Sequence, residues 1–167
     1  SVPSGKWKFN FCKIWSETAI NQSELASNYF NNFYAYNMNQ NTWSTIANYP
    51  GTGRRLAFCT SVNGKGYVAG GVYGSSNLQY ASDFWEYDPL TNAWTQITSF
   101  PLSNRAGGVS FSFGDDIYFG LGHNGNVDYN DLWAFNTVTR LWTQKTSLPG
   151  VARLRASWSI SNGMVLV

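Results

Sequence analysis

The stretch SDFWEYDPLTNAW, residues 82–94, contains a tyrosine–aspartate pair followed by a tryptophan seven residues after the tyrosine. The same pattern of an aromatic residue, Asp or Asn, and a later tryptophan occurs at two other places. It runs from Tyr36 to Trp43, from Tyr87 to Trp94 and from Phe135 to Trp142. The tryptophans are 51 and 48 residues apart. A period near 50 residues predicts that one supersecondary unit is reused along the chain.

Each copy of the pattern predicts a hairpin of two strands. Short aromatic runs such as FWEY (84–87) are bounded by Asn, Asp or Ser, and this composition is typical of strands. A short polar link follows, and then a run such as WTQIT (94–98) that is also rich in strand-forming residues.

A second hairpin is predicted upstream of the first. LAFCTSV (56–62) and YVAGG (67–71) flank the turn sequence Asn63-Gly64-Lys65-Gly66, and later copies have Gly114-Asp115-Asp116 and Asn162-Gly163 at this place. Each full repeat therefore holds four short antiparallel strands, which we name a, b, c and d in chain order. The expected fold class is all-β, and a four-stranded unit of this length is typical of a β-propeller blade.

The combination of residues resembles the kelch family of β-propellers. The resemblance rests on Gly70-Gly71 at the end of strand b, on the Tyr-Asp pair and on the tryptophan seven residues later, and it covers about residues 31–167. The stretch from residue 82 is also similar to the kelch arrays common in secreted and surface proteins of Bacteroidetes-type bacteria. The next copy has Gly120-Leu121-Gly122 in place of the glycine pair. Residues expected in the structural core of the repeat are Tyr36, Trp43, Gly70, Gly71, Tyr87, Trp94, Gly120, Gly122, Phe135 and Trp142.

Counting strands gives about three blades. We expect an N-terminal strand and loop of a partial first blade at residues 1–30, a partial unit at 31–53, blades at 54–104 and 105–152, and a partial unit at 153–167. The alternating stretch KWKFNFCKIW (6–15) is a candidate strand of the first blade. Closed propellers use four to eight blades. The remaining blades are therefore expected from a longer chain or from a second copy of this one, with contact to other subunits as a further alternative.

The amino-acid composition favours one cellular location and argues against some classes of partner. Aromatic residues make up 17% and charged residues only 12% of the chain, about half the usual charged share. This favours a secreted protein that is extracellular or at the cell surface. The net charge of +2 is scattered, so the chain offers no basic stripe for nucleic acid. No apolar run is long enough for a membrane helix, so direct membrane insertion is not expected.

The two cysteines, Cys12 and Cys59, form no metal motif. Each lies in a strand-like stretch, so buried free thiols are expected, with an inter-blade disulfide as the alternative in an oxidising compartment.

Binding is expected on the long connections between strands b and c and between strands d and a, which lie on one face. Amides, tyrosines and arginines there can bind a glycan or a polar protein surface through stacking and hydrogen bonds. The candidate ligand-binding residues are Tyr73, Asn77, Tyr80, His123, Asn124, Asn126, Asp128, Tyr129, Arg54, Arg105 and Arg153.

The arginines also have a structural interpretation. An arginine begins strand a in every copy, and Asp83 and Asp131 recur just before strand c. Arg54 and Arg105 can therefore pair with a carboxylate or with carbonyl groups of a neighbouring blade.

The function expected from these features is a non-catalytic propeller that binds protein or glycan partners at the cell surface or in an envelope assembly. The alternative is a structural subunit of a surface complex or filament. A kelch-like enzyme, carbohydrate-active or an oxidase, with its site in missing blades, is the least favoured. Copper oxidases resembling galactose oxidase need several His and Tyr ligands, and this chain has one histidine, His123.

No catalytic residue, cofactor or metal site is predicted. No Ser-His-Asp or paired-carboxylate constellation stands out. The oxygen-rich stretch from His123 to Asp131 invites comparison with a Ca²⁺ loop, but it lacks the EF-hand spacing and the closing glutamate.

Overall fold

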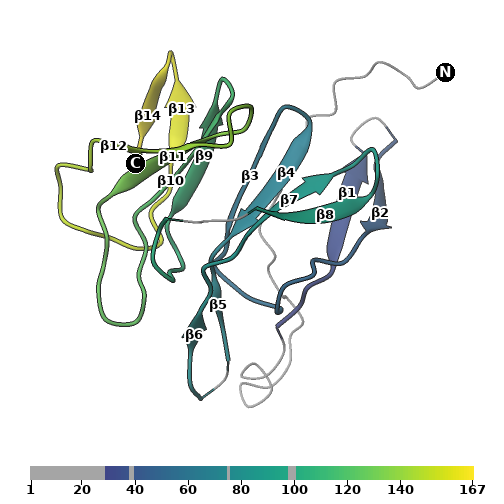
Figure 1. The fold of residues 1–167 in the computed structure, drawn as a ribbon, viewed down its shortest axis with the longest axis horizontal. Coiled ribbons are helices and arrows are strands. Elements are labelled where there is room, and N and C mark those ends of the chain that lie inside the picture. Colours follow the sequence, from purple (N-terminus) through teal and green to yellow (C-terminus); the bar gives the residue numbers. More distant parts are fainter. Residues whose placement is uncertain (1–28, 38–39, 75, 98–100) are drawn as a thin grey trace.

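The structure is a computed structural model that describes residues 29–37, 40–74, 76–97 and 101–167. The expected strand at 6–15 and Cys12 lie outside the described residues. Cys59 is partly buried. Within the described part of the chain all regular structure is antiparallel β-sheet (Figure 1), and no helix there is long and apolar enough to cross a membrane.

Two four-stranded sheets lie between two hairpins. The first hairpin is β1 (Phe33–Asn37) and β2 (Thr42–Ile46). The first complete blade is β3 (Phe58–Val62), β4 (Lys65–Ala69), β7 (Phe84–Asp88) and β8 (Ala93–Ile97). The second complete blade is β9 (Val109–Phe113), β10 (Asp116–Gly120), β11 (Leu132–Asn136) and β12 (Trp142–Lys145). The last hairpin is β13 (Ser159–Ser161) and β14 (Met164–Leu166). The predicted all-β fold of four-stranded antiparallel units is confirmed.

One connection contains more structure than the sequence predicts. Between β4 and β7 the chain forms a small hairpin of β5 (Val72–Tyr73) and β6 (Gln79–Tyr80). In Figure 1 this hairpin projects from the end of the blades opposite to the tips of the β3–β4 and β13–β14 hairpins. We call the end that carries the β5–β6 hairpin and the β10–β11 connection the loop face.

The hydrophobic core lies between adjacent sheets. Phe84 of the first complete blade is fully buried, and its ring centroid lies 5.1 Å from that of Phe135 and 5.5 Å from that of Trp142, both in the second complete blade. One interface earlier, Phe33 of the first hairpin packs against Trp94 at 4.9 Å. The Trp94 indole also donates a hydrogen bond to the Ala47 carbonyl at 2.9 Å. Edge-to-face aromatic packing therefore joins successive blades.

The prediction that Tyr36 and Trp43 belong to the core is wrong. Their relative exposures are 44% and 67%, and each packs against the other at 4.9 Å. Trp94 and Trp142 are covered because each docks onto the preceding sheet. The described part of the chain contains no sheet before the first hairpin on which Trp43 could dock.

Backbone hydrogen bonds also cross between blades, close to the glycines. The Gly71 amide donates to the Arg105 carbonyl of the next blade at 2.9 Å, and the Gly122 amide donates to the Arg153 carbonyl at 2.9 Å. The strand register aligns Leu121, rather than Gly120, with Gly70, because β4 ends at Ala69 and β10 ends at Gly120. Leu121 adopts the left-handed backbone conformation that glycine takes in the first copy (φ 59° against 58°).

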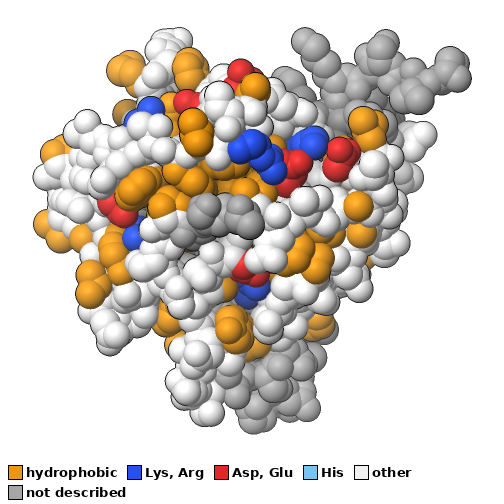
Figure 2. Space-filling model, viewed as in Figure 1, with side chains coloured by type: hydrophobic (Ala, Val, Ile, Leu, Met, Phe, Trp, Pro, Cys, Tyr) orange, Lys and Arg blue, Asp and Glu red, His pale blue; other side chains and the backbone are white. Residues whose placement is uncertain are grey.

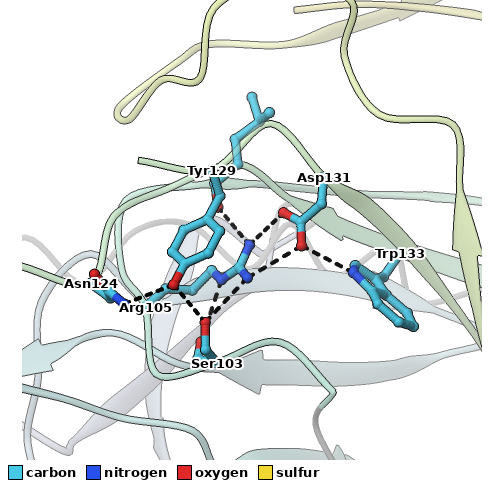
Figure 3. A network of polar contacts seen from close by, with 7 residues as sticks. Ser103, Arg105, Asn124, Tyr129, Asp131 and Trp133 are labelled. Atoms are coloured by element: carbon cyan, nitrogen blue, oxygen red, sulfur yellow. Dashed lines mark hydrogen bonds and ion pairs between the residues drawn. The ribbon is translucent and has the colours of Figure 1, made fainter. Parts of the chain in front are cut away.

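A buried arginine–aspartate pair joins the two halves of each complete blade. Arg54 forms a bidentate ion pair with Asp83, and Arg105 pairs with Asp131 at 2.6 Å. Each arginine also donates to the backbone at the end of strand b, at Gly70 in the first case (2.9 Å). The expected pairing is confirmed, but both partners belong to one blade and not to neighbouring blades. Figure 3 draws the second pair, with the indole of Trp133 donating to the same carboxylate at 3.1 Å.

The surroundings of Asp83 favour its ionised form. Burial would raise the pKa of this carboxyl group, but hydrogen bonds and the charge of Arg54 outweigh it, and the pKa lies below its ordinary value of 3.8. The Trp85 indole and the Tyr49 hydroxyl, each at 3.0 Å from Oδ2, act in the same direction. Burial raises the pKa of Tyr49, which therefore stays protonated as a donor.

Some charges at and near the surface also form pairs. Figure 2 shows Lys and Arg side chains beside Asp and Glu side chains on the viewed face, without a large patch of one sign. The clearest example joins two blades: Glu86 is 8% exposed and pairs with Lys65 at 2.7 Å and with Arg140 of the next blade. Burial raises the pKa of Glu86, but the hydrogen bonds and charges of both cations lower it overall.

We expect Gly122→Ala to lower the free energy of unfolding by about 3 kcal/mol or more. Its φ is 92°, and a Cβ would lie 2.7 Å from the Ala106 carbonyl oxygen. Gly64→Ala is the matched control, because Gly64 has a similar φ of 75° but no atom within 4 Å of the new Cβ. The control should lower the free energy of unfolding by only about 1–2 kcal/mol, the cost of placing an alanine in the left-handed backbone conformation. Urea unfolding measures both, and equal losses would contradict the role of close packing.

We expect Asp83→Asn to cost about 3–5 kcal/mol, because it leaves the Arg54 charge buried without its partner. Asp115→Asn is the control, since Asp115 is exposed and its Oδ1 acceptor for Asn63 is kept in the amide. A depressed folded pKa stabilises the protein above pH 3.8 and loses that effect as the pH falls through the lower folded value. The Asn variant should therefore show a weaker loss of stability below pH 4 in unfolding titrations, and an unchanged acid dependence would contradict the assignment.

Candidate functional site

The loop face carries the same three-residue ladder on both complete blades. In the first complete blade Arg55 lies opposite Val72, and Val72 lies opposite Tyr80. The backbone of Arg55 and Val72 exchanges two hydrogen bonds of 2.9 Å. Arg55 and Tyr80 lie two strand spacings apart on this ladder, and their side chains contact different units. Arg55 lies over the ring of Tyr29, which precedes the first hairpin, whereas Tyr80 lies beside His123 of the second complete blade.

In the second complete blade the equivalent ladder consists of Ala106, His123 and Asp128. Ala106 and His123 exchange backbone hydrogen bonds of 2.9 and 3.0 Å, and His123 lies opposite Asp128. His123 thus occupies the position that Val72 has in the first blade, and Asp128 the position of Tyr80. The two blades therefore share the same backbone arrangement at this place, but their side chains differ, and only the second blade has a histidine and a carboxylate there.

A tight turn brings Asp128 back to His123. The Asn124 side-chain carbonyl accepts hydrogen bonds from the backbone amides of Asn126 (3.0 Å) and Val127 (2.9 Å). Gly125, between Asn124 and Asn126, has a φ of 97°. An asparagine that bonds the backbone two and three residues later is a common turn former. The local sequence therefore explains the turn. The contact between His123 and Asp128 depends in addition on their pairing in the ladder.

His123 and Asp128 form a hydrogen-bonded pair at the surface. Nδ1 of His123 lies 2.7 Å from Oδ1 of Asp128, and the two side chains are 29% and 42% exposed. An ionised carboxylate only accepts, so Nδ1 carries the proton and donates it. Nε2 then remains available, with no hydrogen-bond partner among the described residues. A partly exposed imidazole whose tautomer is fixed by a carboxylate is suited to take up or release a proton at a bound ligand.

Tyr80 of the first blade completes this site from across the blade interface. Its ring centroid lies 6.0 Å from that of His123, with the ring planes at 71°. A Cβ on Gly125 would lie 3.1 Å from the Tyr80 ring, so the turn packs closely against it. The structure therefore brings Tyr80, His123 and Asp128 together, as three of the predicted binding residues on two adjacent loops.

Arg105 and Tyr129 stabilise the turn between His123 and Asp128 through the side chain of Asn124. The Arg105 guanidinium lies 3.6 Å from the Tyr129 ring centroid, and the Tyr129 hydroxyl bonds Ser103 (2.9 Å) and the Asn124 side chain (2.7 Å). Figure 3 shows this stack next to the ion pair with Asp131. Arg105 is only 2% exposed and Arg54 only 4%, so neither side chain presents its charge to a ligand at the surface.

The other predicted binding residues make no side-chain contact with His123 that the structure shows, although Asn126 lies in the turn between His123 and Asp128. No side-chain hydrogen bond in the described part of the chain joins Tyr73, Asn77 or Asn126 to His123. Arg153 is exposed, its Nε donates to the Val151 carbonyl at 3.2 Å, and no described carboxylate pairs with it.

Two residues of this region are missing from the sequence-based prediction. Tyr29 is equivalent to Tyr80, and its hydroxyl donates to the Gly74 carbonyl of the next blade at 2.6 Å. Arg55 lies over the Tyr29 ring at 5.7 Å. The doublet Arg54-Arg55 occurs in one copy of the repeat only, and that departure from the pattern is the signal that could have identified Arg55.

The described residues contain no group of three or more His, Cys, Asp or Glu side chains placed to hold a metal ion. The arrangement on the loop face instead offers an acid–base pair with an aromatic ring beside it.

The chain is similar to several named enzymes. It is 35% identical over 99 residues to the N-acetylneuraminate epimerase of Pasteurella multocida, a match that covers 57% of this chain and 26% of that protein. For the epimerase of Haemophilus influenzae the identity is 32% over 84 residues, covering 49% and 22%. For that of Shigella flexneri it is 32% over 87 residues, covering 51% and 24%. The chain therefore spans about a quarter of the length of these curated relatives.

The fold is similar to that of a solved protein described as YjhT. The superposition has a TM-score of 0.69 and covers 77% of this chain and 48% of that one, at 21% sequence identity. At this identity the likeness supports the propeller-blade fold alone.

The expectation of a non-catalytic binding propeller or structural subunit is wrong, because the curated relatives that the chain matches are named as enzymes. The expectation that the chain is no enzyme conflicts with the same names. A single histidine cannot supply the ligands of a copper oxidase, but one histidine is enough for an acid–base pair. The strand register places Asp128 beside His123, and this juxtaposition is not visible in the sequence.

A family model for the KLHDC2/KLHL20/DRC7 Kelch-repeats domain matches residues 22–166. The match includes both complete blades and all strands that the structure describes. The resemblance noted from the glycine pair, the Tyr-Asp and the spaced tryptophan is confirmed by it. The chain belongs to the Kelch-repeat family of β-propellers.

Proposed function

We propose that this chain is part of a kelch-propeller enzyme that epimerises an acidic sugar of the N-acetylneuraminate class. The observation that carries the proposal is the similarity to three N-acetylneuraminate epimerases over about half of the chain. The loop face adds a chemical reason, because an epimerase needs groups that move protons at the substrate, and His123 with Asp128 is such a group.

In this proposal His123 exchanges a proton with the substrate through Nε2. Asp128 holds the ring orientation through Nδ1 at 2.7 Å and stabilises the imidazolium when it forms. Tyr80 provides an aromatic wall beside the imidazole. Sugar rings commonly present an apolar side to such a surface, while their hydroxyl groups bond to nearby polar side chains.

The proposal extends to residues outside this chain, since the matched relatives are about four times as long as the matched stretch. Further blades, from a longer chain or from a second copy, would supply the other side of the substrate site. We also propose an extracellular or surface location, which rests on the low charge content of 12%.

We expect the complete protein that contains this chain, with all its blades, to interconvert the epimers of N-acetylneuraminate, which proton NMR would follow. His123→Asn should lower kcat by about 100-fold or more, the range of a lost general acid–base group, with a smaller change in KM. Asp128→Asn should lower kcat as well, because the imidazole loses its fixed orientation.

Asp115→Asn is the matched control, because it removes one carboxylate at the opposite end of the blades and should leave kcat unchanged. Full activity of His123→Asn would remove His123 from the mechanism. Absence of turnover by the unmodified complete protein, with its fold verified by circular dichroism, would contradict the proposed function itself.

A further inference from the structure

Two tyrosines of the loop face occupy equivalent positions in successive copies of the repeat. Tyr29 and Tyr80 are 51 residues apart, the same spacing as the first two tryptophans of the pattern. Each lies against a glycine in the b–c connection of the next blade, and both glycines have a left-handed backbone: Gly74 has a φ of 91° and Gly125 a φ of 97°. Both tyrosines are half-buried. The repeat therefore allows a direct comparison of their hydroxyl groups.

The two hydroxyl groups differ in their hydrogen bonds. The Tyr29 hydroxyl donates to the Gly74 carbonyl at 2.6 Å. The Tyr80 hydroxyl lies 3.7 Å from the position that a Cβ of Gly125 would take, and it makes no hydrogen bond to any residue in the described part of the chain. A phenol hydroxyl is both a donor and an acceptor. The Tyr80 hydroxyl therefore keeps both capacities for a bound molecule, whereas Tyr29 uses its hydrogen to join two units.

The ring that carries this hydroxyl is held beside the acid–base pair. The ring centroids of Tyr80 and His123 are 6.0 Å apart, with the planes at 71°. On the turn between His123 and Asp128, a Cβ on Gly125 would lie 3.1 Å from the same ring. The Tyr80 backbone is paired with Val72 in the β5–β6 hairpin. A hydroxyl on a ring that is already in place loses little freedom when it binds. A sugar at the imidazole of His123 therefore lies next to Tyr80.

We infer that the Tyr80 hydroxyl binds the sugar through a hydrogen bond to one of its hydroxyl groups. This inference rests on the proposed function, because it assigns a binding role within the same site. A sugar hydroxyl also both donates and accepts, so it matches the phenol in either direction. His123 and Asp128 supply the proton transfer. The Tyr80 hydrogen bond is made equally to the substrate and to the transition state, and such a bond affects KM rather than kcat.

The test is made on the complete protein that contains this chain, with N-acetylneuraminate as the ligand. Calorimetry gives the Kd, and the NMR assay of epimer interconversion gives KM and kcat. Tyr80→Phe removes the hydroxyl and keeps the ring. It should raise the Kd about threefold to tenfold, as expected for one lost neutral hydrogen bond. KM should rise by the same factor, with kcat within about twofold. Thermal unfolding should not change, because the hydroxyl bonds no described residue.

Two other tyrosines of the loop face are matched controls. Tyr29→Phe removes the same atom where the structure gives it a partner, so it should lower the unfolding temperature and leave the Kd unchanged. Tyr73→Phe removes a hydroxyl that also has no hydrogen-bond partner among the described residues, but Tyr73 makes no contact with His123 there. This variant should change neither the Kd nor the unfolding temperature.

The outcomes separate the inference from the proposed function. An unchanged Kd and KM in Tyr80→Phe, while the unmodified protein binds and epimerises the sugar, would overturn the inference and leave the proposed function intact. A loss of kcat without a change in KM would also overturn it, because the hydroxyl would then act in the chemical step. An equal loss of affinity in Tyr73→Phe would do the same. A complete protein that neither binds nor converts the sugar would overturn both.

Discussion

In each complete blade a buried ion pair joins the arginine that begins strand a to the aspartate before strand c, and this pair anchors the loop between strands b and c. A guanidinium that is 2–4% exposed needs its charge and its donors satisfied. In each complete blade a carboxylate and backbone carbonyls do this together. The pair fixes both ends of the b–c connection, because its acidic member lies at the point where that connection re-enters the sheet. Both complete blades can therefore hold b–c loops of different sequence in the same position.

The sequence predicts the strands of the blades better than it predicts the arrangement of the loops. The Tyr-Asp and Trp pattern predicts the strands, because aromatic residues at this spacing must pack between sheets. Trp43 follows the same pattern yet is 67% exposed, since burial depends on a neighbouring sheet and not on the residue alone. Leu121 takes a backbone conformation that the pattern assigns to glycine, and only the strand register reveals this alignment.

The candidate site is less predictable for a physical reason. His123, Asp128 and Tyr80 can each be chosen from sequence as loop residues, but their meeting depends on two backbone ladders and one contact between blades. His123 itself departs from the repeat, because the equivalent position of the first complete blade is Val72. Departures from a repeat are thus the better guide to function, since the repeated positions of the pattern serve the fold.

In the proposed function an acidic sugar binds on the loop face at His123. His123 is the single histidine of the chain, so its imidazole NMR signals report on this place without any substitution. Titration with N-acetylneuraminate should shift these signals in a saturable way, with the same dissociation constant as calorimetry gives. Imidazole signals that stay unchanged while the sugar binds or is converted would show that the chemistry takes place elsewhere.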